Sequence, residues 1–138
     1  MAVYGVGSRY GTRDVTSEFL NHGLACVGWS EEDAPPLYNM LRHIKIGDLI
    51  YIKSNSQGRL VIKAAGIVLS NVVASHEGAD LGGCIQVRWI WNGWDSVGRV
   101  DDKLNVRSNT LFEELNPDVQ TRVVNHLLSA IPNSSTQA

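Results

Sequence analysis

Residues 44–71, IKIGDLIYIKSNSQGRLVIKAAGIVLSN, predict a β-hairpin and decide the fold. A Gly-Asp turn leads into residues 49–53, a β-branched and aromatic run typical of a strand. Residues 54–58 are polar and end in a glycine that can adopt a positive φ, as tight turns require. Residues 60–69 then return almost wholly apolar, which indicates a strand covered on both faces, as in a small barrel or a sheet flanked by helices.

The composition is that of one ordinary globular domain. The chain has 138 residues, a size that can bury a core without disulfides or metals. We expect a single domain over residues 1–131 with a disordered polar tail at 132–138. The net charge of -2 does not indicate a strongly basic nucleic-acid binder. Cations nevertheless gather on and beside the hairpin, as a solvated face or as a contact for phosphate, namely Arg42, Lys45, Lys53, Arg59 and Lys63.

No targeting, metal or cofactor pattern is present in the sequence. The N-terminus lacks a basic region followed by an apolar one, and no apolar run is long enough to span a bilayer, so we expect a cytoplasmic protein with no membrane partner. In that compartment Cys26 and Cys84 are predicted to be buried thiols rather than a disulfide. The four histidines are scattered without metal-ligand spacing, so we expect no metal and no cofactor.

The first part of the chain alternates strands and helices. Residues 2–8 read as a strand with two glycines, which implies close approach by a neighbouring group. Asp14 can cap a short helix that Gly23 ends, residues 24–29 form a second strand, and Pro35 opens a second helix. The glycines after the first strand do not fit a dinucleotide-binding or phosphate-binding loop.

After the hairpin, residues 72–83 predict a glycine-rich loop and residues 84–91 another strand. Strict alternation along that strand places Trp89 and Trp91 on one face. We expect Trp89 to belong to the core. The Asn-Gly pair that follows predicts a tight turn.

The last third combines a polar segment with one clear helix. Residues 94–111 are expected to be mostly loop, with a final strand near 100–106. Asn116-Pro117 begins an amphipathic helix that continues to residue 131. The whole order predicts an α+β fold, a small, mixed and strongly curved β-sheet or pseudobarrel flanked by about three helices.

The order and spacing of five short pieces resemble the PUA-like superfamily, and especially its EVE and YTH members, over most of the chain. The EVE-like domains that sit beside restriction nucleases are similar as well. The pieces are a first strand leading to Val6-Gly7-Ser8-Arg9, a strand ending in Gly28-Trp29-Ser30, Lys45-Ile46-Gly47-Asp48 before the hairpin, Ala65-Gly66-Ile67-Val68, and Val87-Arg88-Trp89-Ile90.

The resemblance implies a pseudobarrel that recognises nucleic acid, often through a modified base. In the YTH group the tryptophan that closes the second strand is a wall of an aromatic cage, and Trp29 matches it, followed by Ser30 as there. Ser8 and Arg9 match the ligand-contacting turn after the first strand, and Asn109 lies where an acidic residue reads the base. The loop 72–83 contains no aromatic residue, which departs from the YTH pattern of a second cage tryptophan.

Further side chains are candidates on their chemistry. Tyr10, Tyr51 and Trp91 could stack on a base. The candidate phosphate contacts are Lys53, Arg59 and Arg107. The alternatives stay open, because Trp29 could instead pack on the helix from Pro35 and Asn109 could simply form a turn.

We therefore expect a non-catalytic reader that accepts a flipped or single-stranded base, with DNA favoured over RNA by analogy with the restriction-associated domains. No catalytic constellation has recognisable spacing, and Glu113-Glu114 reads as a helix-start acidic pair. The alternatives are a small ASCH-like hydrolase, or a protein-interaction or inhibitor module in a defence or anti-defence system. A nuclease supplied in trans is a candidate protein partner.

Overall fold

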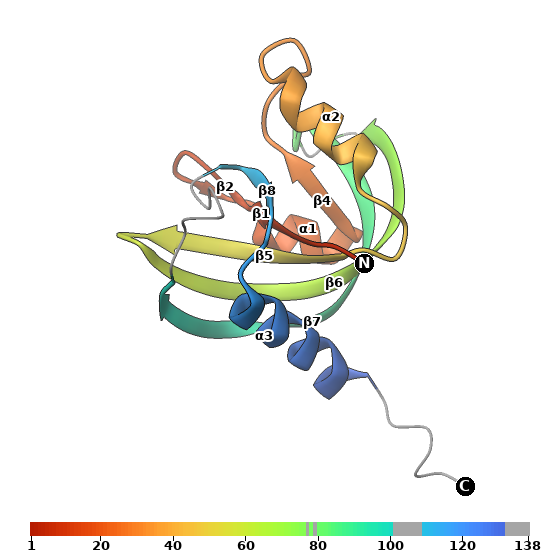
Figure 1. Ribbon diagram of the computed structural model, residues 1–138. Coiled ribbons are helices and arrows are strands. Elements are labelled where there is room, and N and C mark those ends of the chain that lie inside the picture. The colour runs from red at the N-terminus through yellow and green to blue at the C-terminus, as the bar shows by residue number, and fades with distance from the viewer. Residues whose placement is uncertain (77, 79, 101–108, 132–138) are drawn as a thin grey trace, which may run out of the picture.

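The computed structural model describes residues 1–76, 78, 80–100 and 109–131, which form an α+β fold with three helices and a strongly curled six-stranded sheet (Figure 1). The sheet order is β4-β7-β6-β5-β1-β8, and β2 and β3 form a separate two-stranded ribbon. The elements are β1 (Val3–Gly7), β2 (Arg9–Tyr10), β3 (Arg13–Asp14), α1 (Thr16–His22), β4 (Leu24–Val27), α2 (Pro35–His43), β5 (Leu49–Ser56), β6 (Arg59–Ser75), β7 (Gly83–Arg99), β8 (Leu111–Glu113) and α3 (Pro117–Ala130). The predicted polar tail lies outside the described residues.

The hairpin expected from residues 44–71 is confirmed as β5 and β6. Its turn is Gln57-Gly58, where both residues have positive φ, at 53° and 74°. Such a turn follows the right-handed twist of the flanking strands. β5 also pairs in parallel with β1, and β1 pairs on its other edge with β8, so the first strand of the chain lies inside the sheet.

The tight turn predicted at Asn92-Gly93 is wrong, because β7 continues through it to Arg99. The pairing shows why. Between the pairs Ala64↔Asn92 and Ile62↔Asp95, β7 contains one residue more than β6, so the Asn-Gly pair sits at a β-bulge. β6 likewise extends to Ser75, into the segment expected to be loop, and most of the final strand predicted near 100–106 lies outside the described residues.

The sheet has an inner face, covered by α1 and α2, and an outer face, on which α3 lies (Figure 1). Each face has its own core. The inner core includes Phe19, Leu41, Ile52, Ala64 and Ile85, and the outer core includes Tyr51, Ile62, Phe112, Val119 and Val123.

A second bulge in β7 separates two tryptophans that the sequence pattern placed together. Ala65 pairs with Trp91 and Gly66 with Trp89, so Ile90 is an extra residue on β7. Trp89 therefore packs on the inner core, as expected, and its Nε1 donates to the Leu24 carbonyl at 2.9 Å. Trp91 lies on the outer face instead, because the extra residue interrupts the alternation.

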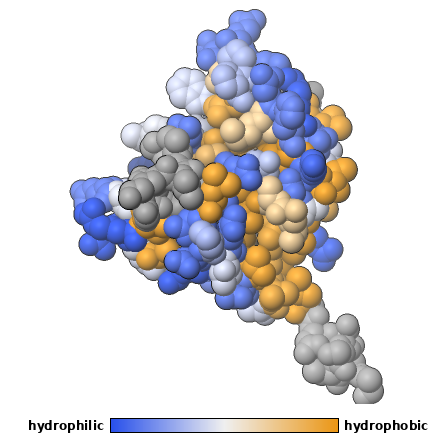
Figure 2. All heavy atoms as spheres, in the orientation of Figure 1, coloured by the Kyte–Doolittle hydropathy of each residue, from blue (hydrophilic) through white to orange (hydrophobic). Residues whose placement is uncertain are grey.

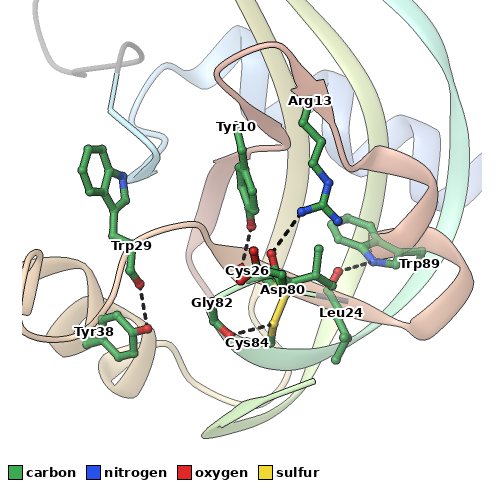
Figure 3. Close-up of a disulfide and its surroundings, with 11 residues drawn as sticks. Tyr10, Arg13, Leu24, Cys26, Trp29, Tyr38, Asp80, Gly82, Cys84 and Trp89 are labelled. Atoms are coloured by element: carbon green, nitrogen blue, oxygen red, sulfur yellow. Dashed lines mark hydrogen bonds between the residues drawn. A yellow bond between two sulfur atoms is a disulfide. The ribbon is translucent and has the colours of Figure 1, made fainter. Parts of the chain in front are cut away.

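The prediction of free thiols is also wrong. β4 and β7 are antiparallel, and their register places Cys26 opposite Cys84, where the two form a disulfide (Figure 3). The two residues are 58 positions apart, and nothing in their local sequence indicates this pairing. The disulfide joins the edge strand β4 covalently to the rest of the sheet.

Two helix ends follow the expected chemistry, but the N-cap of α1 is Val15 rather than the predicted Asp14. Gly23 ends α1 in the left-handed conformation, with φ 66°. Asn116 caps α3, since its side chain accepts hydrogen bonds from the amides of Asp118 and Val119. Figure 2 shows apolar side chains at the surface over the C-terminal end of α3, where Leu128 is 65% exposed.

Candidate functional site

A pocket of about 410 Å³ opens where β1 and β4 end, beside the far end of the β5–β6 hairpin. Five separate segments build it: the turn and ribbon after β1, the residues after β4, the end of β5, the middle of β6 and the residue preceding β8. The lining residues are Gly7, Ser8, Arg9, Tyr10, Gly11, Asp14, Gly28, Trp29, Lys53, Ser54, Asn55, Lys63 and Thr110.

Trp29 presents its indole to this pocket. The side chain is 53% exposed and belongs to neither core, and its Nε1 lies 3.4 Å from Thr110 Oγ1, a long hydrogen bond. Its backbone carbonyl accepts a hydrogen bond from the Tyr38 hydroxyl of α2 at 2.8 Å. Figure 3 shows the indole turned away from Tyr38. Packing on the helix that begins at Pro35 therefore does not account for the side chain, and its ring is open to a ligand.

Tyr10 forms a second aromatic wall in a fixed position. Its hydroxyl donates to the Leu81 carbonyl at 2.8 Å (Figure 3), and a Cβ on Gly28 would come within 2.9 Å of the ring. Glycine at position 28 thus lets the ring lie flat against the chain that leads to Trp29. Burial raises the pKa of the Tyr10 hydroxyl well above its ordinary value, so this group stays protonated and keeps donating.

A hydrogen-bond network centred on Thr16 sets the polarity of the pocket floor. The Thr16 hydroxyl donates to Asp14 Oδ1 at 2.6 Å, and Lys63 Nζ donates to Thr16 Oγ1 at 2.9 Å. Ser8 Oγ lies 2.5 Å from the same oxygen. A hydroxyl has one proton, and that of Thr16 is committed to Asp14, so Ser8 must be the donor in this contact. The buried Ser8 oxygen can then offer a ligand only its lone pairs.

Asp14 stays ionised in this network. Hydrogen bonds from the Thr16 hydroxyl and amide, together with the charge of Lys63 at 3.6 Å, hold the pKa of its carboxyl below the ordinary value. The lining also includes three cations, Arg9, Lys53 and Lys63, so positive charge predominates. Burial lowers the pKa of Lys53, whose Nζ lies 5.9 Å from the centre of the Phe112 ring. An anionic group is the ligand that this balance favours.

The structure brings five of the predicted site residues into the pocket, and they come from three segments. These are Ser8, Arg9, Tyr10, Trp29 and Lys53. Two more lie close by without lining it. Asn109 is exposed next to Thr110, and Ser30 Oγ accepts from the Asp33 amide at 3.2 Å in the turn after Trp29.

Three others lie elsewhere. Tyr51 is fully buried on the outer face, with its hydroxyl 2.6 Å from Glu114 Oε1. Trp91 stacks on His126 of α3, with ring centres 3.8 Å apart. Arg59 is exposed at the start of β6, and Arg107 lies outside the described residues. Glu114, read from the sequence as half of a helix-start acidic pair, is a buried partner of Tyr51 and of the Asn116 amide.

Several residues that line the pocket have no recognisable signal in the sequence. Asp14 does serve the start of α1, since its Oδ1 accepts from the Thr16 amide at 2.9 Å, but it also joins the pocket network. Lys63 was only one member of a cluster of cations on the hairpin. Thr110 follows a polar segment whose path the sequence did not reveal. The contacts of Thr16 with Asp14 and Lys63 depend on the fold and have no recognisable pattern in the sequence.

Comparisons with known proteins assign the chain to no family. No family model matches it, and no curated protein matches it. Within the described part of the chain no three His, Cys, Asp or Glu side chains gather as a metal site would require. None of the described helices has the length and apolar character needed to cross a bilayer.

Proposed function

We propose that the pocket accepts one base of a nucleic acid, flipped out or single-stranded, with Trp29 as its stacking surface. The observation that carries the proposal is the exposed indole of Trp29 at the rim of a pocket in which cations outnumber carboxylates. An aromatic face beside positive charge is the combination with which proteins hold a single base and its phosphate.

The polarity of Ser8 supports this reading. Because its proton is directed to Thr16, Ser8 Oγ would accept a hydrogen bond from an N–H on the base edge. Arg9, Lys53 and Lys63 would contact phosphate oxygens, which position the ligand without reading its sequence. The resemblance to EVE and YTH domains adds the expectation that the base carries a modification, and the analogy with restriction-associated EVE-like domains slightly favours DNA over RNA.

The test is a binding panel of methylated, hydroxymethylated and unmodified oligonucleotides, as DNA and as RNA, measured by fluorescence anisotropy. Stacking on an aromatic side chain is worth roughly 1–3 kcal/mol per base, so Trp29→Ala should weaken binding about 5- to 150-fold. Leu128→Ala, which truncates an exposed apolar residue on α3, is the matched control and should bind like the wild type.

Salt supplies a second readout. Three pocket cations that neutralise phosphate predict that the logarithm of the affinity falls against the logarithm of salt concentration with a slope of about -2 for a single strand. Equal binding to every oligonucleotide, insensitive to salt and to Trp29→Ala, would contradict the proposal.

A further inference from the structure

The inner face of the sheet continues past the pocket onto the far ends of β5, β6 and β7. The register defines a row across these strands, in which Ser54 pairs with Val61 and Val61 with Ser96. Side chains alternate along a strand, so the neighbours two positions away share this face. We call this surface the inner strip, and it consists of Ser54, Arg59, Val61, Lys63, Trp94 and Ser96.

Trp94 is the prominent member of the inner strip. Its neighbour Asp95 points to the outer face, where it bonds Arg122 and His126 of α3, so Trp94 points to the inner face. The side chain is 69% exposed and joins neither core. Tryptophan usually buries most of its large apolar surface, so one left this open offers a stacking plane.

The inner strip is also positively charged. Arg59 is exposed at the start of β6 and supplies one cation. Lys63 supplies a second, and its Nζ also lies 3.6 Å from Asp14 of the pocket. Asp95 of β7 serves the outer face, where it contacts Arg122 and His126.

The inner strip is continuous with the pocket. Ser54 and Lys63 belong to both. Asn92 of β7 pairs with Ala64 of β6, and Asp95 pairs with Ile62. Trp94 therefore lies on β7 beside Lys63 of β6. Neighbouring strands are about 4.8 Å apart, so Trp94 and the pocket lining are separated by a single strand spacing.

We propose that the inner strip extends the pocket into a track for single-stranded nucleic acid, on which a base flanking the pocketed one stacks on Trp94 while Arg59 contacts phosphate. This inference rests on the proposed function and adds the form of the ligand. The occupant is a single strand, since a duplex hides the base faces that an exposed indole would stack upon.

The experiment compares two probe lengths. A fluorescein-labelled trinucleotide reaches the pocket alone, and an oligonucleotide of about nine nucleotides, within the range of single-strand site sizes, also covers the inner strip. The wild type should bind the longer probe more tightly. Trp94→Ala should weaken only the longer probe, about 5- to 150-fold, whereas Trp29→Ala should weaken both.

Matched charge variants separate track contacts from general attraction. Arg59→Gln should weaken the longer probe and flatten its salt dependence by roughly one unit of slope. Arg88→Gln removes the same charge from an exposed position on the outer face of β7 and should change neither. With 5-bromouracil in the longer probe, photocrosslinking should give an adduct on the peptide that contains Trp94. Far-ultraviolet circular dichroism confirms that each variant is folded.

The outcomes are distinguishable. If Trp29→Ala weakens both probes while Trp94→Ala binds both like the wild type and no adduct forms at Trp94, the track is excluded and the proposed pocket stands. If the wild type binds neither probe, or Trp29→Ala changes nothing, the proposed function itself fails and the track fails with it. Tighter binding of a duplex than of the single strand would also overturn the track.

Discussion

The hydroxyl of Tyr38 donates a 2.8 Å hydrogen bond to the carbonyl of Trp29. This contact attaches the backbone of Trp29, and with it the pocket indole, to helix α2. Tyr38 also packs against Gly83, where a Cβ would come within 2.4 Å of its ring. The position of Trp29 thus depends on a helix that does not itself line the pocket.

Tyr38→Phe should therefore lower the free energy of unfolding by about 0.5–1.5 kcal/mol, the value of one hydrogen bond, and weaken oligonucleotide binding as Trp29 loses its anchor. Urea denaturation and anisotropy measure the two effects. Tyr4→Phe is the control, because Tyr4 is half-buried and its hydroxyl has no hydrogen bond among the described contacts. An equal effect of both substitutions would refute the anchoring role.

Gly28→Ala should displace the Tyr10 ring, since the added Cβ would lie 2.9 Å from three ring atoms. Overpacking of this kind costs about 1–3 kcal/mol, and the displaced ring would also narrow the pocket. Thermal unfolding and binding assays test this. At Gly7 a Cβ would come no closer than 3.4 Å to the flexible end of Lys53 and 3.9 Å to the Thr110 carbonyl, so Gly7→Ala should unfold at nearly the wild-type temperature. A fully stable Gly28→Ala would show that Tyr10 can move aside freely.

The double variant Cys26→Ala, Cys84→Ala should be less stable by about 4 kcal/mol, because the disulfide closes a loop across 58 positions and restricts the unfolded chain. Urea denaturation with and without a dithiol measures the difference. The wild type unfolded in the presence of the dithiol should approach the midpoint of the double variant, whereas the double variant should not respond to it. A wild type whose midpoint is the same in both conditions would contradict the stabilising role.

Asp95 gives the fold a dependence on pH. Burial alone would raise the pKa of its carboxyl, but hydrogen bonds from His126 and Arg122, both 2.7 Å, outweigh burial and hold the pKa below its ordinary value. The pKa is thus lower in the folded than in the unfolded chain. Its contribution is present above the unfolded value of about 4 and is lost as the pH falls through the folded value.

Asp95→Asn should accordingly be less stable at neutral pH by about 1–2 kcal/mol, because α3 loses its charged contact with β7. The difference from the wild type should shrink as the pH falls from about 4 through the lower pKa of the folded state, below which the wild-type carboxyl is also neutral. Unfolding free energies measured across this range test the prediction. Asp33→Asn, at an exposed turn, should show no such convergence.

Local chemistry predicted much of the fold. The hairpin turn needed positive φ at Gly58, α1 ended at a left-handed Gly23, and Asn116 capped α3, and each of these depends on residues adjacent in sequence. The place of Trp29 beside the pocket was indicated instead by the resemblance to YTH domains, in which a tryptophan closes the second strand.

What the sequence did not reveal depends on pairing between distant strands. One bulge in β7 makes an Asn-Gly pair part of the strand, and another places Trp91 on the face opposite Trp89. The alternation of apolar and polar residues in the sequence does not reveal such an inserted residue. The Cys26–Cys84 disulfide and the contact of Lys63 with Thr16 likewise follow from register and packing over tens of residues.

The position of β1 inside the sheet has a consequence for synthesis of the protein. This strand is made before both of its partners, β5 and β8, and the pair Tyr4↔Glu113 joins residues far apart in the chain. Its second edge stays open until residue 113 has left the ribosome, and contacts of such long sequence separation form late. We therefore expect a nascent chain stalled before Leu111 to be sensitive to proteases and prone to aggregation, and the nascent sheet to become resistant only once β8 is released.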